Sequence, residues 1–448
     1  MTSEKSTVVL TDDVVKKQLT RGVAIALETC VRCGLCADSC HYYLAKPLPE
    51  NIPAYRGEAL RRLYRQISSP TWRRIRSLLR LNTSPDLSPD SLVDMAFASC
   101  TLCRRCAINC PMGVDNALLM RAARSLVTAS GQAPEILVQL ADTSIDRGEN
   151  LELFREILID NIKSLEEEVR QRTGDPDASI PVERKGADIL FVALSGAHSI
   201  VPPAILFHYA RANWTLSLFE ASNYGVFLGD TERARRIAQR IVDEAKRLEV
   251  KDVVIGECGH AYAALRWEAP KWFGGTFPFR VRSIIEVMAE WIEEGRLTID
   301  RNANREPVTY HDSCNLTRNG GLLEEPRIVL RAAAKDFREM HPNREESYCC
   351  GGGGGIVAVS EWENRRLEAG QPKANQIKAT GAKIVVAACD NCRIQLSELS
   401  DHYSLGVTVT GITDLVVKAL VPAERQAPDS GLVSRPPKAS EGQLSAVK

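Results

Sequence analysis

Cysteine spacing is the feature of this 448-residue chain that most directly indicates chemistry, and the chain contains 14 cysteines. Eight of them lie in two runs, CVRCGLCADSC and CTLCRRCAINC, that share the spacing C-x2-C-x2-C-x3-C. Three thiolates at such short intervals can bind three corners of one cubane [4Fe–4S] cluster, while the fourth thiolate binds the other cluster. Zinc is the alternative, but it prefers tetrahedral sets built from pairs of ligands. The two runs therefore predict two cubane clusters.

The spacing assigns four thiolates to each cubane cluster, with the fourth member exchanged between the runs. The first set is Cys30, Cys33, Cys36 and Cys110, and the second set is Cys100, Cys103, Cys106 and Cys40. One position differs, because Pro111 follows Cys110 whereas His41 follows Cys40. We expect this difference to leave ligation intact but to alter the hydrogen bonding of the sulfur, and so its reduction potential.

A third group of cysteines is spread over a longer part of the chain, with the stretch YCCGGGGGI at its centre. It has the pattern C-x34-C-C-x38-C-x2-C and consists of Cys314, Cys349, Cys350, Cys389 and Cys392. Five thiolates from three separate loops indicate one shared site of another kind. Because glycine has no side chain and adopts backbone angles closed to other residues, we expect the first two or three glycines to let this loop approach a cluster closely. The full run of five stays unexplained.

Composition excludes several classes of protein. Basic and acidic residues balance at 57 each, so no net charge directs the chain to nucleic acid or to a membrane surface. The N-terminus lacks the apolar segment of a signal peptide. The longest charge-free run, 189–210, contains two prolines and a Ser-Gly break, which favours a strand and a buried helix over a membrane span. We therefore expect a cytoplasmic chain, in which reduced thiols bind metal rather than form disulfides.

Hydrophobic patterns divide the first 185 residues into three parts. Residues 1–20 are expected to be a lead-in, and residues 21–130 a helical domain around both cubane clusters, with an insertion at 41–99. Residues 131–185 are predicted to be a helical connector. Within the insertion, a basic stretch is either a solvated helical face or a docking surface for a membrane subunit or anionic headgroups. The apolar side of this stretch consists of Trp72, Ile75, Leu78 and Leu79.

From residue 186 onward, short apolar strands alternate with helices, which predicts parallel α/β sheets. Five strands are expected within 187–194, 214–220, 250–257, 307–312 and 382–389, and the clearest helices within 231–250, 284–295 and 364–381. The stretch RLEVKDVVIGECGHAYAAL aligns with ATGAKIVVAACDNCRIQL, and SNYGVFLGD aligns with SYCCGGGGG. We therefore predict two related lobes, 186–305 and 306–420, followed by a tail at 421–448 with the composition of a disordered segment.

The order of these motifs resembles a known family. The pattern C…CCG…CxxC, with YHDSC at its first cysteine, is similar to the cysteine-rich CCG domain of the heterodisulfide reductase family. The resemblance runs from about residue 20 to 420 and includes the D subunit of the membrane-bound reductase, the K subunit of Dsr complexes and the B subunit of Tmc complexes. It implies an α+β multidomain fold, in which a helical ferredoxin-like domain with two [4Fe–4S] clusters precedes two α/β CCG-type lobes. Only the second lobe would bind a cluster, a noncubane [4Fe–4S] cluster on all five cysteines of the third group.

Several residues are candidates for chemistry at that third cluster. His311 is suited to protonate a leaving thiolate, and a structural histidine bonded to a backbone carbonyl is an equal alternative. Asp312 is expected to orient the loop, and Arg318 either faces an anionic substrate or the reduced cluster, or is a surface residue. Cys258 and His260 occupy the turn of the first lobe that aligns with the CxxC turn of the second. One alternative is that Cys258 is an inert buried thiol and His260 is only its neighbour. The other is that both residues face the third cluster, with His260 as the general acid.

The resemblance implies that a disulfide, a heterodisulfide or a protein-bound trisulfide is cleaved or formed at the third cluster. The substrate would be a disulfide-bearing small molecule or a small sulfur-carrier protein. The electron partner would be a membrane cytochrome b-like or quinone-interacting subunit, which would hold the chain at the cytoplasmic face of the inner membrane. The alternatives are an electron-transfer subunit of a flavin dehydrogenase complex that oxidises glycolate, lactate or glycerol-3-phosphate, and a scaffold whose clusters only transfer electrons.

Overall fold

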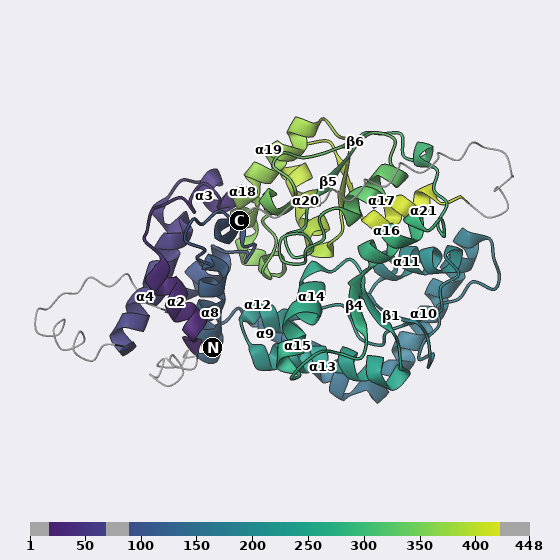
Figure 1. Cartoon of the computed structure of the whole chain (residues 1–448), viewed down its shortest axis with the longest axis horizontal. Coiled ribbons are helices and arrows are strands. Elements are labelled where there is room, and N and C mark those ends of the chain that lie inside the picture. Colours follow the sequence, from purple (N-terminus) through teal and green to yellow (C-terminus); the bar gives the residue numbers. More distant parts are fainter. Residues whose placement is uncertain (1–17, 69–88, 422–448) are drawn as a thin grey trace, which may run out of the picture.

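A computed structural model of the chain describes residues 18–68 and 89–421 (Figure 1). Most of the expected lead-in, the tail from residue 422 and the second half (69–81) of the basic stretch 56–81 lie outside the described residues, so the predictions made for them stay predictions. The four apolar residues of the basic stretch are among those not described: Trp72, Ile75, Leu78 and Leu79.

The N-terminal part of the chain is helical, as its periodicity predicts. Its main helices, α2 (Arg21–Thr29), α4 (Pro53–Ser68) and α8 (Asn116–Ala129), pack against one another. The Asp115 carboxylate begins α8 by accepting hydrogen bonds from two backbone amides of its first turn. The shorter helices of this part are α3 (His41–Ala45), α6 (Pro89–Val93) and α7 (Arg105–Ile108), with a π-helical turn at Asp94–Ala98.

Two long helices, α9 (Glu135–Glu149) and α10 (Leu151–Thr173), form the predicted helical connector. Helix α10 ends at Gly174, which adopts the left-handed conformation that favours glycine. Both helices lie against the first α/β lobe: α9 packs on α13 (Thr231–Leu248), and α10 packs on α11 (Ala197–Tyr209) (Figure 1). The connector is therefore part of the wall of that lobe.

The rest of the chain forms two four-stranded sheets in which all strands are parallel. In the first sheet the order is β2 (Trp214–Leu216), β1 (Ile189–Val192), β3 (Asp252–Ile255) and β4 (Arg280–Ser283). In the second sheet the order is β6 (Phe337–Arg338), β5 (Val308–His311), β7 (Ile384–Ala387) and β8 (Thr408–Thr410). The five expected strands are confirmed. The three strands that the sequence did not indicate (β4, β6 and β8) are edge strands, which are partly exposed and lack a continuous apolar run.

The helices also follow the prediction, with one exception. The stretch 364–381, expected as one helix, consists of α18 (Glu363–Ala369) and α19 (Gln371–Thr380). The chain turns at Gly370, where a Cβ atom would lie 2.6 Å from a methyl carbon of Leu399, and Pro372 begins the next helix. The remaining helices of the two lobes are α12 (Tyr224–Leu228), α14 (Gly259–Ala263), α15 (Ala269–Trp272), α16 (Ile284–Glu293), α17 (Glu325–Ala333), α20 (Asp390–His402) and α21 (Ile412–Ala419).

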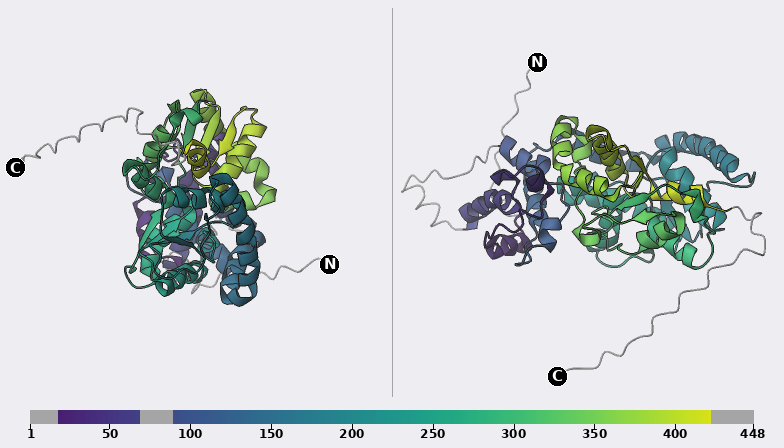
Figure 2. Two further views of the ribbon diagram at one scale, coloured as in Figure 1. Left: turned by 90° about the vertical axis from the view of Figure 1, so that its right-hand side faces the viewer. Right: turned by 90° about the horizontal axis from the view of Figure 1, so that it is seen from above.

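The two lobes share one topology, and equivalent elements meet where they pack. Helix α16 of the first lobe packs on α17 of the second, and α21 of the second packs on α11 of the first. Helices α11 and α17 follow the first strand of their sheets, and α16 and α21 follow the last strand. Such an exchange of equivalent surfaces is what an approximate twofold relation produces. The views in Figure 2 show the helical part at one end of the paired lobes.

Candidate functional site

The first set of cysteines lines one small cavity in the helical part. Cys30, Cys33 and Cys36 reach the cavity from the first run, and Cys110 reaches it from the second. Cys33 is exposed at the surface of the protein. The pKa of Cys36 is raised mainly by burial, with the nearby thiols of Cys30 and Cys110 adding to the shift. We call these four residues the first site.

The second set gathers deeper in the protein, where the helical part meets the second lobe. Burial raises the pKa of the Cys106 thiol, and the neighbouring thiols of the other three members raise it further: Cys103, Cys40 and Cys100. The two runs follow the same backbone path, because Arg32 and Gly34 have positive φ, and so do Leu102 and Arg104 at the matching positions. We call the four residues of this set the second site.

The third group of cysteines meets at the carboxyl edge of the second sheet, where open α/β folds place ligands. Cys314 follows β5, and Cys389 and Cys392 begin α20 directly after β7. Cys349 and Cys350 come from the CCG loop, which we define as residues 348–356. All five side chains are buried. We call them the third site.

Short contacts connect the thiols of the third site in a chain. Hydrogen bonds from Cys103 and Cys314 lower the pKa of Cys349 to about 6. The sulfur of Cys350 lies 3.5 Å from that of Cys392. Hydrogen bonding from Cys392 lowers the pKa of Cys389 to about 7. The loops therefore bring all five sulfurs together.

The surroundings of these thiols fit iron–sulfur clusters. The backbone amide of Gly351 points at the sulfur of Cys349 (3.4 Å), and that of Gly352 points at the sulfur of Cys350 (3.5 Å). Amides directed at sulfur stabilise thiolate ligands and tune the potential of a cluster. Thirteen thiols fall into three groups of four, four and five, and only Cys258 lies outside them. The donor sets therefore suit two cubane clusters and one cluster of another kind.

Close packing accounts for four glycines of the CCG loop (Gly351, Gly352, Gly354 and Gly355), which explains most of the run that the sequence left unexplained. At Gly352 a Cβ atom would lie 2.8 Å from the Cβ atom of Gln395 on α20. At Gly354, where φ is +67°, a Cβ atom would lie 2.9 Å from the carbonyl oxygen of Thr101. The first part of the run therefore packs on α20, and the last part packs on the loop of the second site. The glycines therefore allow close contact both with α20 and with the loop of the second site.

The second and third sites touch each other. The hydroxyl of Thr101, in the second cysteine run, lies 3.4 Å from the sulfur of Cys349. A ring nitrogen of His41 and the sulfurs of Cys103 and Cys349 all lie within 4.8 Å of one another. We expected His41 to alter hydrogen bonding at the neighbouring sulfur of Cys40, but its hydrogen bond reaches the sulfur of Cys103. The imidazole therefore stands between the two sites.

Two arginines hold this junction through backbone carbonyls. Arg318 donates to the carbonyls of Glu345 and Cys103, at 2.7 and 2.9 Å, and also to that of Ser347. These bonds hold the segment just before the CCG loop against the second run. They occupy the guanidinium for which we expected either a role facing a substrate or the reduced cluster, or a surface role. They identify Arg318 as a positioning residue, and a catalytic role for it stays a prediction.

The second arginine, Arg124 on α8, is fully buried. Its guanidinium donates to four carbonyl oxygens at 2.6–2.8 Å, those of Ala96, Cys100, Phe227 and Gly354. Phe227 belongs to the stretch of the first lobe that aligns with the CCG loop, so this one side chain joins both aligned loops to the second run. Sequence reasoning missed Arg124. The signal that could have indicated it is an arginine on the apolar face of a helix, between Met120 and Val127.

His311 and Asp312 behave differently, although they are neighbours. Neither ring nitrogen of His311 has a hydrogen-bond partner among the described residues, and a ring nitrogen lies within 4.8 Å of the sulfurs of Cys350 and Cys392. Within the described residues the ring is therefore not bonded to a backbone carbonyl, and a proton-donating role for His311 stays a prediction. Asp312 instead binds the buried guanidinium of Arg327 at 2.6 and 2.8 Å and accepts a bond from the amide of Arg344. Asp312 orients the loop, as expected.

Cys258 and His260 occupy the turn of the first lobe that is equivalent to the CxxC turn of the second. Nε2 of His260 accepts a hydrogen bond from the backbone amide of Asn223 (3.2 Å), so in the neutral ring the proton is on Nδ1, 3.3 Å from the sulfur of Cys258. Burial lowers the pKa of His260 to about 4 and raises that of Cys258 well above its ordinary value. Both residues are internally satisfied, and a general-acid role for His260 stays a prediction.

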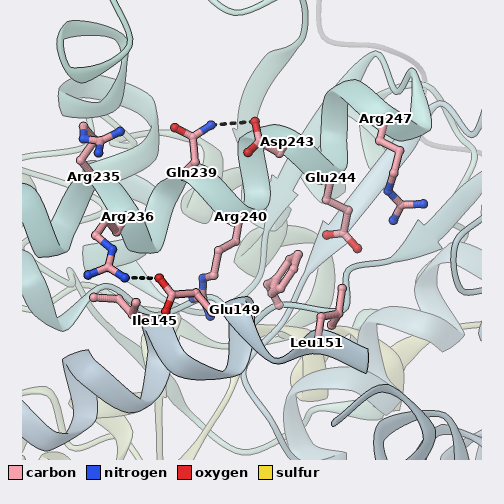
Figure 3. A pocket seen from close by; sticks show the side chains of 12 residues that line it. Ile145, Glu149, Leu151, Arg235, Arg236, Gln239, Arg240, Asp243, Glu244 and Arg247 are labelled. Atoms are coloured by element: carbon pink, nitrogen blue, oxygen red, sulfur yellow. Dashed lines mark hydrogen bonds and ion pairs between the residues drawn. The ribbon is translucent and has the colours of Figure 1, made fainter. Parts of the chain in front are cut away.

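Two cavities differ in their relation to these sites. One, of about 270 Å³, lies where the helical part meets both lobes and is lined by Thr101, His260 and Asn315, among others. It therefore reaches the residue that touches Cys349. Another pocket lies between α9 and α13 and is lined by arginines and carboxylates (Figure 3). No cysteine lines that second pocket.

Comparison with known proteins agrees with this arrangement. The family model "4Fe-4S dicluster domain" matches residues 26–114, and the model "Cysteine-rich domain" (CCG) matches residues 308–397. The chain is 29% identical to the "Hdr-like menaquinol oxidoreductase iron-sulfur subunit 2" of Archaeoglobus fulgidus, over 90% of this chain and 81% of that protein. It is 25% identical to the D subunit of the dihydromethanophenazine:CoB--CoM heterodisulfide reductase of Methanosarcina barkeri, over 92% of this chain and 98% of that protein.

The chain is therefore similar over most of its length to heterodisulfide reductase-like iron–sulfur subunits. Another relative, the "EtfAB:quinone oxidoreductase" of Syntrophomonas wolfei, is 23% identical over 83% of this chain and 55% of its own length. In this chain a dicluster domain precedes the CCG domain, and the two parallel-sheet units supply the α/β part of the fold. Within the described ranges no helix combines the length and the apolar character that a membrane crossing requires.

Proposed function

We propose that this chain breaks or forms an S–S bond at its third site, as the redox subunit of a membrane-associated complex. In this proposal the five cysteines of the third site bind a noncubane [4Fe–4S] cluster, and the first and second sites bind cubane clusters. When bound, such clusters supply one-electron transfers and an iron that can take up a substrate sulfur. The contact of Thr101 with Cys349 is the observation that carries the proposal, because it places the second site directly against the third.

The chain's own residues supply positioning and a relay for a proton. Arg318 and Arg124 fix the CCG loop and the segment just before it to the second run through backbone carbonyls, which holds the two sites at a constant separation. His311 is buried beside two sulfurs of the third site, and its ring nitrogens have no partner among the described residues. Burial lowers the pKa of His311 well below its ordinary value, with the charge of Lys373 adding to the shift, so in this proposal the ring relays a proton to a leaving thiolate rather than storing one.

In this proposal the substrate approaches through the cavity between the helical part and the lobes, which no cysteine of the third site lines directly. Thr101 forms part of the cavity wall and contacts Cys349, and Asn315, next to Cys314, lies in the same wall. The substrate in this proposal is a small disulfide or the disulfide or trisulfide of a sulfur-carrier protein. Electrons would be exchanged at the exposed edge of the first site, near Cys33, with a quinone-interacting or cytochrome b-like membrane subunit.

Anaerobic EPR spectroscopy tests the proposal. After oxidation in the presence of a thiol substrate, the protein should show a paramagnetic signal that depends on the thiol and is absent in the Cys349→Ser variant. The matched control is Cys258→Ser, which changes a buried cysteine outside the three sites and should keep the signal. If the wild-type protein shows both cubane signals and no thiol-dependent signal, the sulfur chemistry is refuted.

A second candidate function is supported by the similarity to the quinone oxidoreductase of Syntrophomonas wolfei. In that case the chain would pass electrons from a flavoprotein toward a quinone, and the third site would act only as a relay. The same EPR experiment separates the two candidates, because a relay changes its oxidation state without any dependence on added thiol.

A further inference from the structure

The second site is surrounded by buried positive charge that lacks a carboxylate partner. Arg56 on α4 is 4% exposed; its Nη1 donates to the carbonyl of Asn51 (3.0 Å), and its Nη2 lies 3.5 Å from the sulfur of Cys40. Its Nε has no hydrogen-bond partner among the described residues. In the part of the chain that the structure describes, no ion pair joins this guanidinium to an acidic side chain. Among the groups that can carry negative charge, the one that this guanidinium contacts in the described residues is the Cys40 thiol of the second site.

Arg124 supplies another buried charge of the same kind next to the second run. It is completely buried, and its four acceptors are all neutral carbonyl oxygens, one of which belongs to Cys100. Within residues 18–68 and 89–421 it too has no carboxylate partner. A buried guanidinium without a counterion is costly unless a nearby anion balances it.

The first site has a different environment. Arg61 donates to the carbonyl of Cys30 (3.3 Å), but its Nη1 lies 3.7 Å from the Glu58 carboxylate. Glu58 also pairs with Arg32, at 3.0 Å. Positive charge near the first site is therefore partly neutralised. Because Cys33 is exposed, the first site also lies close to solvent, which screens charges.

These charges matter because a cubane cluster on four thiolates is anionic and gains one more negative charge when it is reduced. Burial alone disfavours this added charge and lowers the potential, whereas nearby positive charge raises it. The low dielectric of the interior strengthens the effect of such a charge. We infer that Arg56 and Arg124 stabilise the reduced form of the second site, so that an electron is held beside the third site rather than at the exposed first site. This inference deepens the proposed function and rests on it, since it assumes clusters at both four-cysteine sites.

An anaerobic redox titration of the cluster-loaded full-length chain, followed by EPR, tests the inference. In Arg56→Gln the midpoint potential of one cubane signal should fall while that of the other is unchanged. Arg124→Gln should lower the potential of the same signal. Arg56→Lys keeps the charge and should retain most of the wild-type potential. If altered packing rather than lost charge caused the fall in Arg56→Gln, the potential would fall in Arg56→Lys as well. Arg61→Gln, at the first site, is the matched control and should leave the affected signal where it is in the wild type.

The result that overturns the inference is a wild-type potential for both cubane signals in Arg56→Gln, or an equal shift of both. In either case the proposed function still stands, because the clusters are present. Absence of cubane signals from the anaerobically purified wild-type chain would instead refute the proposed cluster content, and the inference with it. If Arg124→Gln does not fold, the comparison of Arg56→Gln with Arg56→Lys decides the matter alone.

Discussion

The hydroxyl oxygen of Thr101 lies 3.4 Å from the sulfur of Cys349, although 248 positions of sequence separate the two residues. Thr101 belongs to the second cysteine run, and Cys349 belongs to the CCG loop of the second lobe. This contact joins the helical part and the α/β part at their most cysteine-rich surfaces. Backbone changes at this junction should therefore be felt on both sides of it.

Replacing a sulfur of the third site should remove metal from that site only. In Cys349→Ser we expect the iron content of the purified protein to fall while both cubane EPR signals remain, because the eight other ligands are untouched. Iron analysis and EPR on the same sample make the measurement. Cys258→Ser is the control, since Cys258 is buried in the first lobe and is hydrogen-bonded to His260. Equal iron loss in the two variants would contradict the assignment of the third site.

The last glycines of the CCG loop should be sensitive to a single methyl group. In Gly354→Ala the new Cβ atom would lie 2.9 Å from the carbonyl oxygen of Thr101, and φ at this position is +67°. The left-handed conformation alone costs about 1–2 kcal/mol for a residue with a Cβ atom. We expect lower thermal stability and a weakened junction, measured by anaerobic thermal unfolding and by iron retention.

Gly353→Ala is the matched comparison for that variant. Its Cβ atom would lie 3.3 Å from the same carbonyl oxygen, and its φ is not positive, so a small local shift relieves the contact. We expect it to lose much less stability than Gly354→Ala. If both variants behave alike, the close approach of the CCG loop to Thr101 does not limit stability.

Loss of the Arg124 guanidinium should destabilise the protein strongly. Arg124→Gln leaves several buried carbonyl oxygens without a donor, which costs about 3 kcal/mol or more, since each unsatisfied group costs about 1–3 kcal/mol. Arg121, one turn earlier on α8, forms a partly exposed pair with Glu268, and its replacement by Gln should cost about 1 kcal/mol or less. Denaturant unfolding under anaerobic conditions compares the two variants. A similar loss in both would show that the four carbonyl contacts contribute little.

The first lobe contains a carboxyl group that should make its stability depend on pH. Glu244 lies on α13 (Figure 3). Burial raises its pKa from about 4.5 to about 7, although the amide of Leu218 and the hydroxyl of Ser217 donate to its carboxylate. The folded state therefore holds a proton that the unfolded state releases between these values. The contribution of this protonated carboxyl to the free energy of unfolding is fully present below about pH 4.5 and is lost as the pH rises through 7. The loss amounts to about 3 kcal/mol by pH 8.

Glu244→Gln should flatten this dependence, because the amide does not ionise. Midpoints of urea unfolding at pH 5 and pH 8 measure the difference between the variant and the wild type. Asp243→Asn, on the exposed side of the same helix, is the control and should leave the dependence unchanged. A wild-type slope in Glu244→Gln would show that another group causes it.

Much of this architecture was predictable because its signals are local. The strands β1, β3, β5 and β7 are buried along their whole length, so each appears in the sequence as a continuous apolar run. The cysteine runs have spacings that only a few metal centres require. The edge strands were missed because partial exposure removes that apolar signal, as in Arg280–Ser283.

The residues at the junction of the sites were harder to predict, since their partners are distant in sequence. Nothing near Thr101 indicates its contact with Cys349, and the glycines of the CCG loop are explained only by the segments that pack against them, α20 and the second run among them. Arg124 binds backbone carbonyl oxygens, which every residue has. The sequence therefore contains no particular residue type that would reveal its partners. Sequence patterns show which residues can bind metal, whereas tertiary packing decides which sites adjoin.

The carbonyl partners of Arg124 also have a consequence for the order in which the protein is made. Ala96 and Cys100 precede the arginine in the chain, Phe227 follows about a hundred residues later, and Gly354 is synthesised last. A nascent chain that ends between Phe227 and Gly354 therefore already contains the two cysteine runs, but the buried guanidinium of Arg124 still lacks one of its four acceptors. We expect the helical part to reach its final closed form only after the CCG loop has left the ribosome, so biosynthesis itself would delay completion of the second site until the third can form.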